Sequence, residues 1–122
     1  MKSTVKILGI PLHAGSITDV ISVFLNQREK NNECVSATGA HGLVFSKSNN
    51  DFKKILNSFS INLPDGMPGV WVGRMKGANE MRRCYGPEFF ESTMRASSET
   101  HLTHFLCGGK EGVADKLKLV CE

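Results

Sequence analysis

The sequence predicts a single α/β domain over residues 1–122, with a parallel sheet that helices cover on both faces. Short apolar segments alternate along the chain with longer segments of helical periodicity. The apolar segments lack the in-and-out alternation of a half-exposed sheet, as is typical of strands buried on both faces. Polar or glycine-rich turns follow three of them, at the edge where parallel sheets bind ligands.

The first expected element is an edge strand over residues 5–10. Pro11 should end it, because proline lacks the N–H that a ladder needs. A helix to about Asn26 follows, and its apolar residues recur on one face. Ser16 or Thr18 is expected to cap this helix, since a side-chain oxygen can accept from the first free N–H groups.

The next segments are a polar turn at 30–32 and a buried strand over 34–37. Two short helices over 40–47 and 51–57 should follow, separated by a break at 48–50. An apolar strand over 60–63 then leads into a proline- and glycine-containing turn.

The second half of the chain is expected to hold three helices and one strand. The apolar helix over 67–75 carries Pro68 in its first turn, where proline is tolerated, and Trp71 at a spacing typical of the core. Further segments are a helix over 87–98, a strand over 104–107 and a helix over 112–120. Together the segments predict a parallel, Rossmann-like sheet.

Composition limits the classes of partner. The net charge is +3 and the basic residues are scattered, which gives no sign of a nucleic-acid tail but suits small anionic molecules. No apolar run approaches a membrane span. The four cysteines form no CxxC pair or zinc spacing, so no metal is predicted, and Cys34 and Cys107 are expected to be buried thiols. This usage fits the cytoplasm.

Asp65 is the first candidate for chemistry. It follows a strand and precedes a helix, within Leu63-Pro64-Asp65-Gly66-Met67. A carboxylate at this edge is well placed to accept a proton as a general base, if proton transfer accompanies bond formation. The alternative is an N-cap aspartate in a tight turn, since Asp-Gly is a common turn pair.

Three other turns are candidate ligand sites. In the segment 38–42, Thr38 and Gly39 precede His41, which can bind an anion or shuttle a proton, or else simply start a helix. Arg83 lies before a glycine turn and is either a diphosphate clamp or part of a solvated loop. Gly108 and Gly109 form either a phosphate loop or a plain turn. Their segment matches neither the Walker A pattern nor the dinucleotide-binding pattern. The missing dinucleotide pattern disfavours a nucleotide-binding oxidoreductase.

The order of four motifs resembles the WecG/TagA/CpsF glycosyltransferase family, also called glycosyltransferase family 26. The motifs run from Thr38-Gly39-Ala40-His41-Gly42 through Leu63-Pro64-Asp65-Gly66-Met67-Pro68 and Arg83-Cys84-Tyr85-Gly86-Pro87 to Cys107-Gly108-Gly109-Lys110. The chain is similar to the subgroup with a Thr-Gly-x-His-Gly turn.

The resemblance implies inverting transfer of a sugar, often N-acetylmannosamine, from a UDP-sugar to a lipid-linked diphosphate in bacterial cell-surface polymer synthesis. By this resemblance Asp65 is the general base, while Thr38, Gly39, His41, Arg83, Gly108 and Gly109 bind substrate, without a cofactor. The enzyme is then expected in the cytoplasm, peripheral to the inner face of the cell membrane.

The resemblance also implies that the chain is an N-terminal portion, since family members continue past the Gly-Gly helix. The α/β sheet is then expected to be truncated at its C-terminus, and its bare edge to favour a homo-oligomer. Two hypotheses therefore remain open from the sequence. One is an active glycosyltransferase, and the other is an inactive remnant that acts as a binding or interaction module.

Overall fold

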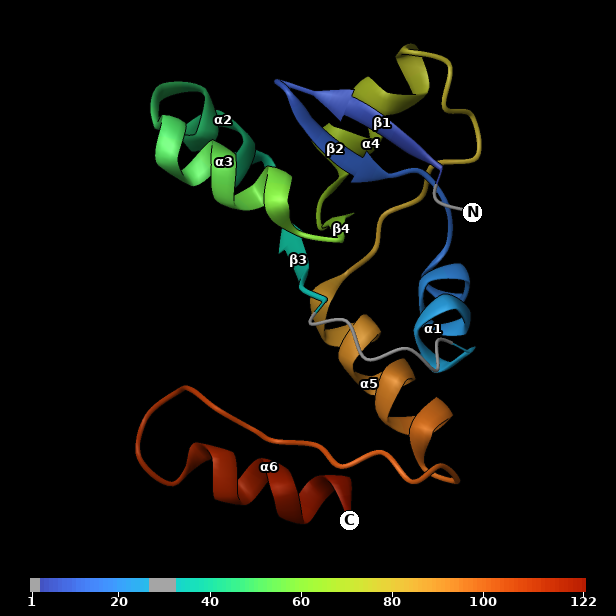
Figure 1. Ribbon diagram of the computed structural model, residues 1–122, viewed down its shortest axis with the longest axis vertical. Helices are drawn as coiled ribbons and strands as arrows, with labels where there is room; N and C mark the ends of the chain where they lie inside the picture. Colours follow the sequence, from blue (N-terminus) through green and yellow to red (C-terminus); the bar gives the residue numbers. More distant parts are fainter. Residues whose placement is uncertain (1–2, 27–32) are drawn as a thin grey trace.

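The computed structural model describes residues 3–26 and 33–122 (Figure 1). The expected turn at 30–32 lies outside these residues. The elements are β1 (Thr4–Ile7), β2 (Ile10–His13), α1 (Ile17–Asn26), β3 (Val35–Thr38), α2 (Ala40–Ser48), α3 (Asn50–Ser58), β4 (Ile61–Pro64), α4 (Met67–Met75), α5 (Gly86–Ser97) and α6 (Val113–Cys121). The predicted α/β class is confirmed, although the sheet is small.

The predicted edge strand over 5–10 is wrong, because the chain turns back within it. β1 and β2 form an antiparallel hairpin in which Ile7 pairs with Ile10, so the loop contains only Leu8 and Gly9. Both loop residues have positive φ, 52° and 80°, as a two-residue hairpin turn requires.

Pro11 does not end a strand but lies inside β2, opposite Lys6. The Ala14 N–H donates to the Ser3 carbonyl, and antiparallel pairs alternate between bonded and non-bonded positions. The pair Lys6–Pro11 is therefore a non-bonded one. The missing N–H of proline removes no bond between the two strands.

β3 and β4 form the parallel pair that the sequence predicts, with Val35 opposite Ile61 and Thr38 opposite Pro64. β2 lies beside β4, where the Asn62 side-chain amide donates to the Pro11 carbonyl at 3.3 Å. All four residues of β4 are buried. β4 is thus the central strand of the described part of the fold.

Helices cover β4 on both faces, as predicted. Ile61 and Leu63 point into a cluster with Val20 of α1, against which Phe89 of α5 packs. The side chain between them, Asn62, points to the opposite face and donates to the Leu56 carbonyl of α3 at 2.9 Å. The cluster on that face joins the hairpin to three helices through these residues: Leu43 of α2, Leu56 of α3 and Val70 of α4.

Two polar residues start the early helices. The Asp19 N–H donates to the Ser16 hydroxyl and the Ser16 N–H donates to the Asp19 carboxylate, so Ser16 rather than Thr18 is the cap. These bonds to Ser16 lower the pKa of Asp19 below its ordinary value. At the break between α2 and α3, the Asn49 side chain accepts from the Phe52 N–H at 2.9 Å.

The helix α4 presents an unexpected face to the core. Trp71, predicted in the core, is 57% exposed, whereas Gly69, Val70 and Gly73 are buried. A methyl group at Gly73 would collide with Met81 and approach Val5, so only glycine lets α4 pack this closely. The buried face therefore consists of small residues, and the large ones point outward.

The predicted strand over 104–107 is also wrong. In the described structure these residues form no ladder, and Phe105 is 90% exposed. They belong to a segment that leads from α5 to α6, which lies apart from the strands (Figure 1). None of the described residues of α6 is buried. An apolar segment forms a strand only where a partner edge is within reach, and none adjoins it among residues 3–26 and 33–122.

The helices of the described segments are all too short or too polar to cross a lipid bilayer.

Candidate functional site

The turns that follow β3 and β4 meet at Asp65. The Asp65 N–H donates to the Thr38 carbonyl at 3.1 Å, which continues the parallel ladder by one residue. A Cβ at Gly39 would lie 3.0 Å from the Asp65 carbonyl oxygen. The two predicted turns are therefore in direct contact, as the carboxyl ends of paired parallel strands must be.

The capping interpretation of Asp65 is wrong. Gly66 is the N-cap residue of α4, and Asp65 precedes it by one position. Gly66 has φ of 156°, a conformation that glycine adopts far more readily than other residues. The Asp65 side chain is 25% exposed. It makes no capping hydrogen bond to α4 and pairs with Arg83 instead.

Arg83 and Asp65 form an ion pair with 3.7 Å between the guanidinium nitrogen and Oδ1. The Arg83 guanidinium also lies 4.6 Å from the centre of the Tyr85 ring, which holds it by a cation–π contact. The backbone is fixed at this point because the Cys84 N–H donates to the Pro64 carbonyl at 2.9 Å. Two segments that are distant in sequence thus bring a cation beside the carboxylate.

The N-terminus of α5 completes this arrangement. A Cβ at Gly86, the first residue of α5, would lie 3.5 Å from Asp65 Oδ2. The start of α4 adjoins the same carboxylate through Gly66. Free N–H groups at a helix N-terminus attract anions. Arg83 and the two helix starts therefore surround Asp65 with groups that can bind a phosphate or diphosphate.

A chain of partly buried hydrogen bonds links β3 and β4 beside the site. The Ser36 hydroxyl is 2.7 Å from the Thr38 hydroxyl and donates to the Asn62 side-chain oxygen at 2.6 Å. Thr38 and Asn62 are buried. The Thr38 side chain is thus already hydrogen-bonded within the sheet, and its carbonyl is what contacts Asp65.

Sequence reasoning missed Ser36, Asn62 and Tyr85. Ser36 and Asn62 are polar residues inside otherwise apolar strands. This position could have indicated them, because a polar side chain that is buried needs a hydrogen-bond partner. Nothing in the sequence shows that Tyr85 lies over Arg83, because the contact depends on the backbone turn before α5.

The cysteines differ in their burial. Cys84 is buried, and this burial raises the pKa of its thiol to about 11, so it stays neutral near pH 7. The expected burial of Cys34 and Cys107 is wrong, since both thiols are exposed. The segments that carry them lie at the surface of the described structure.

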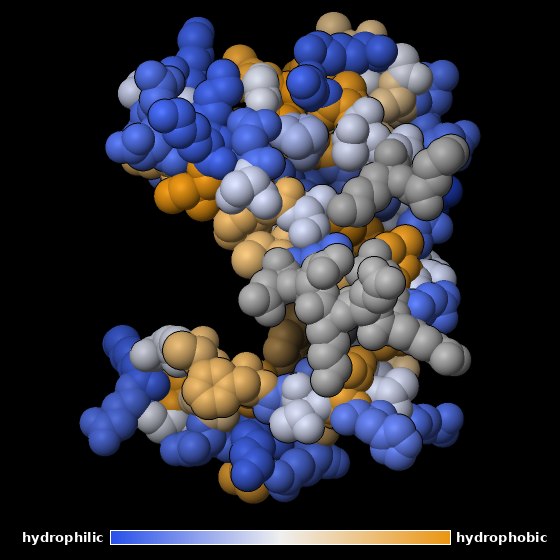
Figure 2. All heavy atoms as spheres, in the orientation of Figure 1, coloured by the Kyte–Doolittle hydropathy of each residue, from blue (hydrophilic) through white to orange (hydrophobic). Residues whose placement is uncertain are grey.

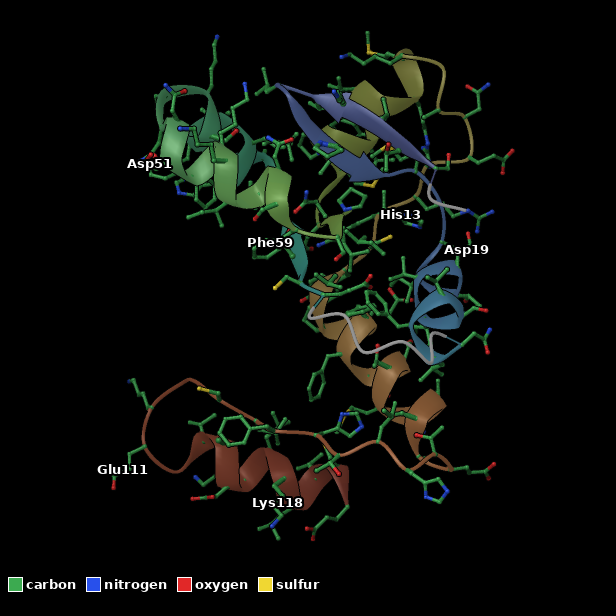
Figure 3. All side chains as sticks on the ribbon, viewed as in Figure 1. His13, Asp19, Asp51, Phe59, Glu111 and Lys118 are labelled. Carbon is green, nitrogen blue, oxygen red and sulfur yellow. The ribbon has the colours of Figure 1, made fainter. Side chains whose placement is uncertain are left out.

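The structure does not bring all the predicted residues together. His41 is exposed in the first turn of α2. Gly108 and Gly109 are exposed in the loop that also carries Glu111, which Figure 3 shows beside α6 and away from the strands. Their substrate-binding roles stay predictions. Within residues 3–26 and 33–122, no three His, Cys, Asp or Glu side chains group closely enough to hold a metal ion.

Comparison with known proteins gives one family. No curated protein matches the chain. The model of the family described as "Glycosyl transferase WecG/TagA/CpsF family" matches residues 5–122, nearly the whole sequence. The matched region contains every element that builds the site around Asp65. The chain therefore belongs to the WecG/TagA/CpsF family of glycosyltransferases, which act in cell-surface polysaccharide synthesis.

Proposed function

We propose that the chain transfers a sugar from a UDP-sugar to a lipid-linked diphosphate acceptor, with Asp65 as the general base. One observation carries the proposal. Asp65 is not a helix cap but a partly exposed carboxylate, paired with Arg83 at the carboxyl ends of two parallel strands. Family membership supports sugar transfer as the class of reaction.

The proposed step is a single displacement. The acceptor hydroxyl oxygen attacks the anomeric carbon of the donor while Asp65 takes the hydroxyl proton. The bond from the anomeric carbon to the diphosphate oxygen breaks, and UDP leaves with the electron pair. Attack from the face opposite the leaving group inverts the anomeric configuration. A carboxylate suits this role because proton transfer runs together with bond formation.

The surrounding groups are proposed to hold the diphosphate. Arg83 is half-exposed and fixed over Tyr85, so its remaining N–H groups can bind phosphate oxygens in a defined direction. The starts of α4 and α5 add N–H groups and positive potential beside it. His41, Gly108 and Gly109 are proposed to contact substrate if the segments that carry them close over the site.

N-acetylmannosamine is the donor sugar that the family resemblance favours. We propose that the reaction takes place at the cytoplasmic face of the cell membrane.

The second candidate function is a binding module without transfer activity. One observation favours it, because the loop that precedes α6 and carries Gly108 and Gly109 lies away from the strands in this structure (Figure 1). Binding of UDP without turnover distinguishes it from the enzyme.

The first prediction concerns Asp65→Asn, which keeps the shape of the side chain but removes the base. We expect turnover of UDP-N-acetylmannosamine with a lipid-linked diphosphate acceptor to fall about 100-fold or more. The donor KM should change little, because the proposed donor contacts remain. Asp51→Asn on the outer side of α3 is the matched control and should leave turnover unchanged (Figure 3).

Calorimetry and thermal melting make this experiment decisive. Both variants should have the melting temperature of the parent chain, and both should bind UDP as tightly as the parent chain does. Equal turnover by Asp65→Asn and Asp51→Asn would reject the base assignment. A parent chain that binds UDP but transfers none of a panel of UDP-sugars would favour the binding module instead.

A further inference from the structure

The outer face of α4 is apolar and exposed. Its residues recur at helical spacing of three and four positions, and they are Pro68, Trp71, Val72 and Met75. Trp71 is 57% exposed and Met75 85% exposed. The opposite face is already packed against the hairpin. A helix that is apolar on both sides and buried on only one needs a second apolar environment.

Charged residues around this face are mostly cations. Residues 65–83 contain four of them, Arg74, Lys76, Arg82 and Arg83, against two carboxylates, Asp65 and Glu80, and Arg83 is paired with Asp65. Lys76 and Arg74 are held at the end of α4, since Lys76 donates to the Lys6 carbonyl and Arg74 to the Met81 carbonyl. A tryptophan beside an excess of cations is the combination that anionic lipid surfaces attract.

The face lies close to the proposed reaction site. Met67 begins α4 two residues after Asp65, and Trp71 follows one turn later, a rise of roughly 6 Å. A lipid surface in contact with Trp71 and Met75 would therefore present the headgroup of a lipid-linked acceptor at the end of α4 that leads to Asp65. This last step rests on the proposed function, whereas lipid binding itself does not.

We propose that the outer face of α4, formed by Pro68, Trp71, Val72 and Met75, docks on an anionic lipid surface. Trp71 and Met75 enter the boundary between headgroups and acyl chains, and the cations at the end of the helix contact lipid phosphates. A second copy of this chain is the other occupant that such a face allows. The charge excess disfavours it, because two copies would bring like charges together.

Trp71 is the only tryptophan of the chain, so its fluorescence reports this face directly. Vesicles of phosphatidylcholine and phosphatidylglycerol should shift its emission to shorter wavelength, and brominated lipids should quench it. Vesicles of phosphatidylcholine alone should shift it much less. Added salt should weaken binding, since it screens the cations.

Co-sedimentation with vesicles measures how much the outer face of α4 contributes to lipid binding. The double variant Trp71→Ser with Met75→Ser should bind about tenfold more weakly or worse, because both side chains lose apolar area that the lipid would bury. Ile55→Ser on α3 is the matched control, since Ile55 is 53% exposed and also apolar. It should bind within about twofold of the parent chain.

Three results would overturn the proposal. They are an unshifted Trp71 emission on anionic vesicles, equal binding by the double variant and the parent, and a concentration-dependent dimer that Trp71→Ser abolishes. These measurements require no transfer activity. An inactive protein that binds vesicles through Trp71 would thus reject the proposed function and keep this inference.

Discussion

Gly39 determines how closely the turn after β3 approaches Asp65. A side chain at this position would place its Cβ 3.0 Å from the Asp65 carbonyl oxygen, and a backbone atom cannot swing away as a side chain can. This contact explains why glycine follows threonine in the motif Thr38-Gly39. Its glycine lets two neighbouring turns touch.

We predict that Gly39→Ala destabilises the fold by about 1–2 kcal/mol, because the two turns must separate. Urea unfolding measures this change. Gly69→Ala is the matched control, since its new methyl would meet only side chains at 3.5 Å and beyond. It should cause no loss of stability. If Gly39→Ala unfolds at the same urea concentration as the parent chain, the close contact of the two turns is not rigid.

Among the residues of the site, sequence reasoning found those at the ends of strands and one in the loop before α5. Thr38, Gly39 and Asp65 could be predicted because parallel strands bring their carboxyl ends to one edge, and Arg83 because of its place in the order of motifs. The role of Asp65 as a cap was equally compatible with the sequence. Only the position of Gly66 as N-cap decides between the two.

At the scale of the elements, the hairpin is the clearest departure from the sequence-based expectation. The run from Val5 to Ile10 has strand composition throughout, and composition does not show that the strand folds back on itself. The available signal was Gly9, which precedes the second strand at a spacing typical of a two-residue turn. Leu8 beside it has φ of 52°, which is unfavourable for a leucine.

Leu8→Asn should therefore stabilise the protein. Asparagine tolerates positive φ and is favoured before glycine in this turn. Leu8 is 43% exposed, so the replacement gives up only part of a buried side chain. We expect the free energy of unfolding to rise by roughly 0.5–1 kcal/mol in thermal or urea denaturation. Leu8→Val, with a branched Cβ, should lower it. The opposite order of the two variants would contradict the turn conformation.

The helix α4 shows why amphipathic patterns can mislead. Trp71 and Met75 have the spacing of core residues, but the helix packs through Gly69 and Gly73 because the hairpin lies very close. Periodicity locates a stripe of apolar residues without showing which of two apolar stripes faces the core. The choice depends on the distance between packed elements.

At the scale of the whole molecule, the described structure has a packed body and a separate C-terminal arm, defined here as residues 99–122. Figure 2 shows a wide hollow between the body and the arm, with apolar residues along its borders. A groove of about 670 Å³ lies between α5 and α6, lined by residues that include Phe90, Met94, Leu117 and Val120. The arm thus adds little packing to the body.

We predict that amide hydrogens of α6 exchange rapidly, while those of β4 exchange only through unfolding of the body. The reason is burial, since all four residues of β4 are buried and none of the described residues of α6 is. Hydrogen exchange followed by mass spectrometry compares the two elements in one sample. Equal protection of α6 and β4 would show that the arm packs on the body in solution.

The sequence by itself determined the α/β class, the positions of the helices, the strand ends that carry Thr38 and Asp65, and Arg83 as a candidate in the motif before α5. These features depend on local periodicity, on turn residues and on the rule that parallel strands share one ligand-binding edge. Only the tertiary structure decided that residues 4–13 form a hairpin, that Trp71 faces outward, and that residues 104–107 remain unpaired. Strand pairing and helix packing depend on which edges and surfaces meet in space, and the local sequence does not record that.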